Sequence, residues 1–351
     1  MRVSAWAIIL VCLIPAFLIW LGACQSTQKV APQESYSAKG VDATTLVGRP
    51  SMPQQSAINT ATVISVPPAA LVTATPVMGQ VRWDMVRSWV YQLSGYQNDR
   101  LDQIAGSHFD LAVVDLARDG GGGYFTPSEV AAITGSGKLA LAYFEVGAIE
   151  DYRPEWSQVP ADLKLGAVAG WPAEQYVKYW DERWWPIVKG RVDQAIAAGF
   201  DGAYLDMVVS YEEIPANAAG TNRQDLASKM VDLIARLAQY AKGVAPEFKI
   251  VPQNSPELYT WPKYLPAIDG LGMEELYFQA TDNACSASWC QENRANAQAI
   301  RGAGKLVLTI DYADVAANIA STYTQSRAAG FVPYASVVGL NVMRVNPGWD
   351  P

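Results

Sequence analysis

Histidine is almost absent from this 351-residue sequence, which contains one, His108. That scarcity argues against catalysis by Ser-His-Asp or Cys-His units and against zinc sites built from several histidines. Acid–base chemistry would then rest on carboxylates, tyrosines or lysines. Basic residues are outnumbered by acidic ones, 26 to 34, and the formal net charge is −8. A nucleic-acid partner is disfavoured, because it would need a basic surface to meet its phosphates.

Residues 1–24 have the pattern of an export signal. Arg2 supplies a positive start, an apolar run follows, and Leu21-Gly22-Ala23-Cys24 ends the segment. This is the layout of a secretory signal, and its end resembles the lipobox of bacterial lipoproteins, in which cleavage precedes a cysteine that is lipidated. We therefore predict lipidation at Cys24 and an exported protein, anchored through lipid to the outer membrane or the cell surface. A plain transmembrane anchor is the alternative, because about 20 apolar residues can span a bilayer.

Cysteine is also scarce. Of the four cysteines, Cys12 lies in the predicted signal and Cys24 ends it, which leaves Cys285 and Cys290. In an oxidising compartment two cysteines at this short spacing favour a local disulfide, with two free buried thiols as the alternative. The pair lacks the partners that a zinc site needs, so no metal is expected.

Residues 25–80 differ in composition from the rest of the chain. Ser, Thr, Pro, Ala and Gln dominate, and Tyr36 is the one aromatic residue. Such a segment cannot bury enough apolar surface to offset the entropy of ordering it, so we predict a disordered tether. The folded domain is therefore expected over residues 81–351, and the acidic excess of the sequence falls on it.

Strand-like and helix-like stretches alternate within 81–351. Several of the expected strands are continuous apolar runs, as in parallel strands buried on both faces. The expected strands are Trp89–Leu93, Phe109–Asp115, Lys138–Glu145, Phe200–Asp206, Phe248–Gln253, Ile268–Tyr277, Leu306–Asp311 and Phe331–Ser336. Helices are expected from Pro127, from Pro172 through Ala198, over Asn222–Ala241 and over Asp314–Ala329. Together they predict an α/β fold, a (β/α)8 TIM barrel, rather than a doubly wound open sheet, because no G-x-G-x-x-G follows the first strand.

Carboxylates recur where the expected strands end, which is where barrels of this kind carry their active sites. A charge at the end of a buried strand is costly unless it is paired or used, so the set as a whole indicates a site. Its members are Asp115, Glu145, Asp206, Glu274 or Glu275, and Asp311. Two carboxylates facing each other across a groove are the minimum for glycoside hydrolysis. Adjacent strand residues point to opposite faces, and the alternation leaves the choice between Glu274 and Glu275 open.

Several motifs together resemble those of glycoside hydrolase family 114, whose members are TIM-barrel endo-α-1,4-polygalactosaminidases. The motifs are FDLAVVD, LAYFEVG with EDYR, GFDGAYLD at 199–206, VPQN, DGLGMEELYF, LTIDYA and GFVPYAS, in this order. The resemblance implies an endo-acting hydrolase that cleaves α-1,4-linked galactosamine or N-acetylgalactosamine polymers, as in a galactosamine-rich exopolysaccharide, without a cofactor. The acidic domain would attract a cationic, de-N-acetylated polymer.

The resemblance also implies roles for single residues. The aspartate of the family's fourth strand falls on Asp206, as nucleophile, and the Gly-x-Glu order places the general acid/base on Glu274, in a retaining reaction. Residues implied to bind the sugar or to support its site are Asp115, Tyr143, Glu145, Arg153, Gln253, Asn254, Asp311 and Tyr312. The sequence departs from the family at Ala148, where glutamate often follows the glycine, so that one substrate contact is not carried over.

Three other functions remain open from the sequence. The first is a surface lipoprotein that binds polysaccharide without cleaving it, and the second is a hydrolase of a different amino-sugar polymer. The third is a Mg²⁺-dependent hydrolase with four carboxylates as oxygen ligands, namely Asp115, Asp206, Glu274 and Asp311. We expect a monomer.

Overall fold

The computed structural model describes residues 79–351. The predicted signal peptide at 1–24, its lipidation site Cys24 and residues 25–78 of the predicted tether lie outside the described residues. Between residues 79 and 351, no helix is long and apolar enough to cross a membrane.

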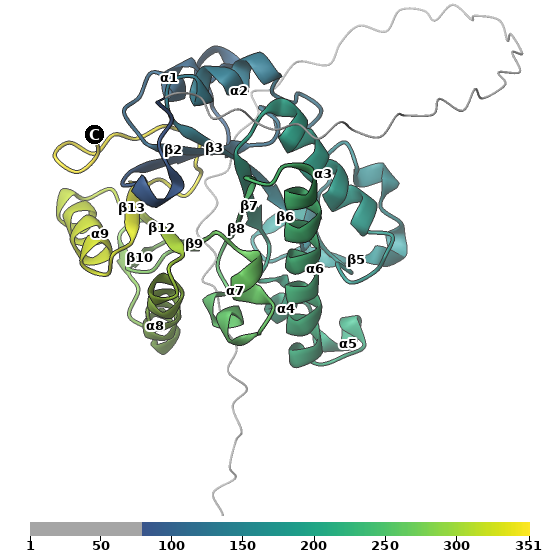
Figure 1. The fold of residues 1–351 in the computed structure, drawn as a ribbon. Coiled ribbons are helices and arrows are strands. Elements are labelled where there is room, and N and C mark those ends of the chain that lie inside the picture. The colour runs from purple at the N-terminus through teal and green to yellow at the C-terminus, as the bar shows by residue number, and fades with distance from the viewer. Residues whose placement is uncertain (1–78) are drawn as a thin grey trace, which may run out of the picture.

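Parallel strands form the centre of the described part of the chain (Figure 1). They are β1 (Trp89–Gln92), β2 (Leu111–Asp115), β3 (Leu139–Glu145), β7 (Gly202–Asp206), β8 (Lys249–Pro252), β9 (Gly270–Glu274), β12 (Leu306–Tyr312) and β13 (Val332–Ser336). Hydrogen bonds join them in the orders β1-β2-β3-β7-β8 and β9-β12-β13. A bridge between Gln253 and Gly272 links the end of β8 to β9. On the other side β13 lies beside β1, where Trp89 packs against Tyr334.

This arrangement is the predicted (β/α)8 barrel, and each of its strands falls within a predicted strand or differs from it by one residue at an end. The prediction succeeds because these strands are buried on both faces, as all seven residues of β3 are. In such strands the apolar run itself is the signal. Neighbours in parallel register share a face, so Tyr91, Tyr143 and Tyr204 all point into the barrel, where their rings pack together.

Helices surround the strands (Figure 1). They are α1 (Asp102–Ala105), α2 (Pro127–Thr134), α3 (Trp185–Ala198), α4 (Ser210–Glu213), α5 (Ala216–Ala219), α6 (Arg223–Val244), α7 (Tyr264–Ala267), α8 (Ser288–Gly302) and α9 (Ala316–Ala328). Single turns of 3₁₀ helix occur at Trp83–Met85, Gln97–Asp99, Trp156–Gln158, Ala161–Leu163 and Pro256–Thr260. Side-chain caps begin two of the predicted helices: Thr126 and Glu129 form a capping box at α2, and Asn222 accepts from the Asp225 amide at α6.

The predicted helix from Pro172 through Ala198 is wrong in its first half. Residues 148–177 instead form an antiparallel sheet with the order β4-β6-β5, made of β4 (Ala148–Glu150), β5 (Lys164–Val168) and β6 (Trp171–Val177). In β6 burial alternates, with Glu174 and Tyr176 buried and Gln175 only half-buried, which is the two-residue period of a strand. The helix begins at Trp185, and Pro186 rather than Pro172 lies in its first turn. This inserted sheet follows β3 directly.

A short hairpin connects β9 to α8. Its strands are β10 (Phe278–Gln279) and β11 (Asn283–Ala284), and Cys285 and Cys290 form a disulfide between the end of the hairpin and the start of α8. This is the pairing favoured by the sequence. The hairpin loop is thus fixed just beyond Glu274, the last residue of β9.

Candidate active site

Two carboxyl groups lie at the mouth of the barrel, meaning the C-terminal ends of its strands. Asp206 ends β7 and Glu274 ends β9, with β8 between them. Asp206 pairs in register with Glu145, and Glu274 with Ile310. Glu274 binds the lumen-facing Tyr312 whereas Glu275 folds back to accept from the amide of Ala280, so Glu274 is the glutamate that faces the lumen.

Neutral donors hold this carboxylate pair. The hydroxyl of Tyr143 donates to Asp206 Oδ2 at 2.6 Å, and the amide of Met207 donates to Oδ1 at 2.6 Å. The hydroxyl of Tyr312 donates to Glu274 Oε1 at 2.5 Å, and Asn254 Nδ2 donates to Oε2 at 3.1 Å. Each carboxylate oxygen therefore accepts one hydrogen bond, and no cationic side chain among residues 79–351 forms an ion pair with either group.

Burial raises the pKa of both carboxyl groups. The pKa of Asp206 rises to about 7, first because burial disfavours the charged form and second because Glu274 is negative. The pKa of Glu274 is also raised, mainly by burial, against the hydrogen bond from Tyr312. The negative charge of each group disfavours ionisation of the other, so the two titrations are coupled. One carboxyl can then donate a proton while the other acts as nucleophile or base.

The backbone turns sharply just after three adjacent strands. Met207, Asn254 and Glu275 have φ values of 57°, 61° and 57°, and they follow β7, β8 and β9. A left-handed conformation is costly for residues with a Cβ, on the order of 1 kcal/mol each. At Met207 this turn points the amide at the Asp206 carboxylate, and at Asn254 it places the side chain against Glu274. The strained backbone at Met207 and Asn254 therefore fixes the orientation of the two carboxyl groups.

Aromatic side chains fill the lumen below the pair. The hydroxyl of Tyr91 donates to Gln253 Oε1 at 2.9 Å, and the ring of Tyr204 packs against Tyr91. The ring of Tyr204 also fills the space beside Gly272, where an added Cβ would lie 2.0 Å from the hydroxyl oxygen. Only glycine fits there, which gives a steric reason for the glycine of the Gly-x-Glu motif.

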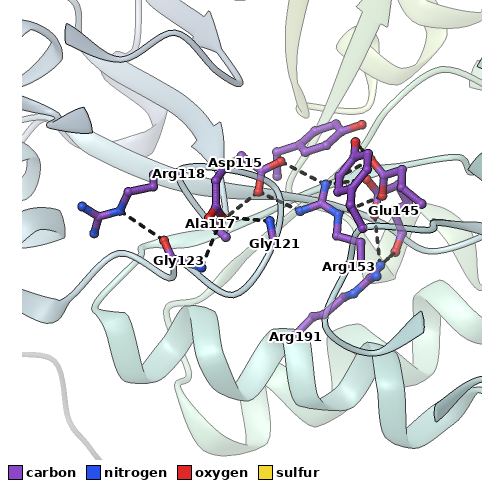
Figure 2. Close-up of polar contacts among 12 residues, drawn as sticks. Asp115, Ala117, Arg118, Gly121, Gly123, Glu145, Arg153 and Arg191 are labelled. Atoms are coloured by element: carbon purple, nitrogen blue, oxygen red, sulfur yellow. Dashed lines mark hydrogen bonds and ion pairs between the residues drawn. The ribbon is translucent and has the colours of Figure 1, made fainter. Parts of the chain in front are cut away.

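A second group of charges is bound by arginine, as Figure 2 shows for Asp115, Glu145, Arg153 and Arg191. It lies beside the pair, because Glu145 is the register partner of Asp206. Arg153 binds both oxygens of Asp115 at 2.9 and 3.0 Å, Glu145 at 2.7 Å and Glu150 at 2.8 Å. Arg191 binds the other oxygen of Glu145 at 3.1 Å. Burial raises the pKa of Asp115, and Arg153 opposes that rise. These buried side chains bind one another, so direct contact of Asp115, Glu145 and Arg153 with substrate stays a prediction.

Comparison with known proteins agrees with this geometry. The family model described as glycoside-hydrolase family GH114 matches residues 72–348. The chain belongs to family GH114. This GH114 chain is 34% identical over 306 residues to a protein of Deinococcus radiodurans, covering 85% of this chain and 94% of the relative. It is 30% identical over 301 residues to a protein of Thermotoga maritima, covering 80% and 90%. The chain is therefore a glycoside hydrolase.

Two solved structures share the fold of this GH114 domain. Ega3 of Aspergillus fumigatus, crystallised with galactosamine, has a TM-score of 0.60 and 16% identity, and the match covers 78% of this chain and 99% of that one. The glycoside hydrolase domain of PelA from Pseudomonas aeruginosa has a TM-score of 0.61 and 17% identity, covering 74% and 98%. At this identity the likeness establishes the fold.

One predicted site residue of the GH114 chain lies elsewhere. Asp311 is fully buried, and its Oδ1 accepts from the amides of Tyr277 and Phe278. Thr309, on the same face of β12, binds Ser326 of α9, so this face points outward to the helices. Asp311 therefore holds the loop after β9, and its predicted role in lining the sugar site stays a prediction.

The donor set for the magnesium alternative does not assemble. Asp115 is bound to Arg153, and Asp311 points away from Asp206 and Glu274. In the described residues, no three His, Cys, Asp or Glu side chains gather closely enough to hold a metal ion.

Several residues of this site were not predicted from the sequence. Tyr204 lies two positions before Asp206 on one strand, so alternation alone would place both in the lumen. Glu150 and Glu174 belong to the inserted sheet and Arg191 to α3, and no local pattern points to them. Tertiary contacts alone bring these charges to the barrel mouth.

Proposed function

We propose that this GH114 protein is an endo-acting hydrolase of α-1,4-linked galactosamine or N-acetylgalactosamine polymers. The observation that carries the proposal is the buried pair of Asp206 and Glu274 at the barrel mouth, held by hydrogen bonds from Tyr143 and Tyr312. The pKa of both carboxyl groups is raised, mainly by burial, which allows the pair to keep a proton available near neutral pH.

An amino-sugar polymer is the proposed substrate class for two reasons. The Ega3 structure, which shares the fold, was determined with galactosamine. The net charge of this chain is −8, and a field of that sign attracts a polymer of protonated amines.

The proposed mechanism is retaining, with Asp206 as nucleophile and Glu274 as general acid/base. Glu274 protonates the leaving glycosidic oxygen while Asp206 attacks C1, forming a glycosyl–enzyme ester. Glu274 then removes a proton from water, which attacks C1 and releases Asp206. Tyr143 and Tyr312 would hold the two carboxyl groups in the required orientations.

The deciding experiment incubates the full-length protein with de-N-acetylated and N-acetylated α-1,4-galactosamine polymers and analyses the products by mass spectrometry. We expect oligosaccharides of several lengths, formed first as the α-anomer, which NMR of the fresh products would detect. Binding by titration without any new reducing ends would instead support the non-catalytic alternative. If only a different amino-sugar polymer were cleaved, that polymer would replace galactosamine as the assigned substrate.

Chemical rescue separates the two roles. Azide should restore turnover to Asp206→Ala by replacing the missing nucleophile, with an inverted glycosyl azide as product. Glu274→Ala should retain activity on an aryl glycoside, whose leaving group needs no proton. Azide rescue of Glu274→Ala, with activity of Asp206→Ala on the aryl glycoside, would instead make Glu274 the nucleophile and Asp206 the general acid/base.

We also propose that the protein is exported, lipidated at Cys24 and anchored to the outer membrane or cell surface, and that it acts as a monomer. Replacement of Cys24 by alanine should release the protein into the soluble fraction and abolish incorporation of labelled palmitate. Unchanged membrane association of that variant would favour the transmembrane alternative.

A further inference from the structure

The hairpin after β9 turns through an uncommon backbone conformation. Its strands β10 and β11 pair Gln279 with Asn283, which leaves a turn of three residues between them. All three are left-handed, with φ values of 40° at Ala280, 50° at Thr281 and 63° at Asp282. Each of them carries a Cβ, so each costs on the order of 1 kcal/mol. Such a turn persists where contacts to the rest of the molecule hold the backbone in place.

Asp282 makes the contacts that hold this turn. Its carboxylate accepts hydrogen bonds from the amides of Asp314 at 3.0 Å and Val315 at 3.1 Å, and from Asn318 Nδ2 at 2.9 Å. These donors lie in the link before α9 and in its first turn. The backbone amide of Asp282 donates to the carbonyl oxygen of Tyr312 at 2.8 Å. The tip of the hairpin is therefore bound to the segment that begins with Tyr312, the last residue of β12.

Tyr312 is thus held at two points. Its carbonyl oxygen accepts from Asp282, and its hydroxyl donates to Glu274 Oε1 at 2.5 Å. Glu274 ends β9, the strand from which the hairpin leaves, and the next residue, Glu275, accepts from the amide of Ala280 at 2.9 Å. The hairpin therefore joins β9 to β12 a second time, next to the contact between Tyr312 and Glu274. A tyrosine ring is rigid, so a shift of the Tyr312 backbone would move its hydroxyl, and a hydrogen bond weakens steeply with misalignment.

We propose that Asp282 is a positioning residue for the general acid, because it fixes the backbone of Tyr312 so that the tyrosine hydroxyl stays bound to Glu274. The inference rests on the proposed function and adds to it a residue that acts on the reaction only through Tyr312. Without the Asp282 carboxylate, the left-handed turn loses its three hydrogen bonds to the start of α9 and can relax, and Tyr312 can shift with it.

The pKa of Glu274 reports whether the contact is intact. Burial raises this pKa, and the hydrogen bond from Tyr312 lowers it, so a weakened bond leaves the pKa higher still. The removal of a negative charge at Asp282 would by itself act in the other direction and lower it. The titratable groups that face Glu274 are Tyr91 of β1, Tyr204 and Asp206 of β7, Glu275 after β9 and Tyr312 of β12.

Kinetics of Asp282→Ala on a de-N-acetylated α-1,4-galactosamine polymer test the proposal. We expect kcat to fall about tenfold because the acid is misplaced, with KM unchanged. The alkaline limb of the kcat/KM profile should move to higher pH, whereas loss of the charge alone would move it to lower pH. Asp282→Asn also lacks the charge, but it keeps an acceptor oxygen and tolerates a left-handed backbone, so it should recover most of the activity.

Combination with Tyr312→Phe is the decisive measurement. Tyr312→Phe already lacks the hydroxyl that Asp282 is proposed to position. Addition of Asp282→Ala to this variant should therefore reduce kcat by no more than about twofold and leave the alkaline limb where Tyr312→Phe puts it. Residues that act independently would instead give losses that multiply.

Two further variants keep the test independent of folding. Asn318→Ala removes one of the three donors to Asp282 and places a good helix former in α9, so it should fold and give a smaller shift in the same direction. It replaces Asp282→Ala in the double variant if that protein does not fold. Asp119→Ala is the matched control, because Asp119 Oδ1 accepts from the amides of Gly121 at 2.9 Å and Gly123 at 3.2 Å in the loop after β2. It should behave as wild type.

Losses that multiply, or an alkaline limb that stays in place or moves to lower pH, would show that Asp282 only stabilises the hairpin. Wild-type kinetics of Asp282→Ala would remove it from the site altogether. These results overturn the inference while leaving hydrolysis by the wild type intact. Inactivity of the wild type on every galactosamine polymer would instead overturn the proposed function.

Discussion

The barrel mouth carries two groups of buried carboxylates with opposite electrostatic environments. Asp206 and Glu274 accept hydrogen bonds from tyrosines, an amide and an asparagine, and in the described part of the chain no cationic side chain pairs with them. Asp115 and Glu145 face the same lumen but are bound by Arg153 and Arg191. The two groups are neighbours, because Glu145 pairs in register with Asp206.

The two groups differ in what acts against burial, which raises the pKa of a carboxyl group. Neutral donors orient a carboxylate without cancelling its charge, so burial still raises the pKa of Asp206 to about 7. In the arginine-bound group burial raises the pKa of Asp115 and of Glu145, and the positive charge of Arg153 opposes the rise, whereas the pKa of Glu150 is lowered to about 2 because a hydrogen bond with Glu145 and the charge of Arg153 outweigh burial. The second group differs from the pair by its ion pairs, which fix the loop that carries Arg153.

The largest expected effect comes from removing the proton donor of the pair. Glu274→Gln keeps the hydrogen bonds but cannot transfer a proton, so kcat should fall about 10²- to 10⁴-fold. Initial rates of reducing-end release measure this loss, with circular dichroism as a check on the fold. Activity within threefold of the wild type would refute the assignment of Glu274.

A substitution in the arginine-bound group should instead lower the free energy of unfolding. Arg153→Met would leave Asp115, Glu145 and Glu150 buried without their shared cation, and breaking such a pair costs about 3–5 kcal/mol. Denaturant unfolding at pH 7 should show this loss. Exposed Arg183, which pairs with Asp162 and Asp181 on the surface, provides the control, since Arg183→Met should change stability by about 1 kcal/mol or less.

At the proposed catalytic pair, a substitution that removes a charge should raise the folding stability rather than lower it. The pKa of Asp206 is about 7 in the folded protein, above the unfolded value of about 3.9, so ionisation reduces stability as pH rises between these values. Asp206→Asn removes this cost. The variant should match the wild type near pH 4 and be more stable by about 1–4 kcal/mol above pH 7. A stability difference independent of pH would contradict the raised pKa.

The smallest effect belongs to the tyrosine donors. Tyr143→Phe should raise the pKa of Asp206 further and shift the acidic limb of the kcat/KM profile to higher pH, with a loss of about tenfold. Tyr312→Phe should raise the pKa of Glu274 and shift the alkaline limb upward. Tyr91→Phe is the control, because Tyr91 binds Gln253 and neither carboxylate, and both limbs should stay in place.

The barrel could be predicted from the sequence because its strands are buried on both faces. A continuous apolar run is then visible without knowledge of its neighbours. The inserted sheet could not be predicted in this way. Pro172 and the aromatic residues near it fit a helix start, and only pairing with β4 and β5 shows that Trp171–Val177 is a strand.

Strand position alone predicts that Asp206 lies at the barrel mouth, and Asp206 does end β7. Strand position does not predict which of two adjacent residues at a strand end points into the barrel. Asp311 and Tyr312 are adjacent at the end of β12, yet one holds a loop outside the barrel and the other binds Glu274 inside it. The same ambiguity applied to Glu274 and Glu275, and register with β12 resolved it.

Gly272 has a consequence for how sequences of this kind can diverge. The ring of Tyr204 occupies the volume that any side chain at position 272 would need. Neither residue can therefore be exchanged first without a misfit of the kind that costs about 1–3 kcal/mol in a packed interior. We therefore predict that a homologue with a larger residue at 272 carries a smaller one at 204. In an alignment they should vary together or not at all.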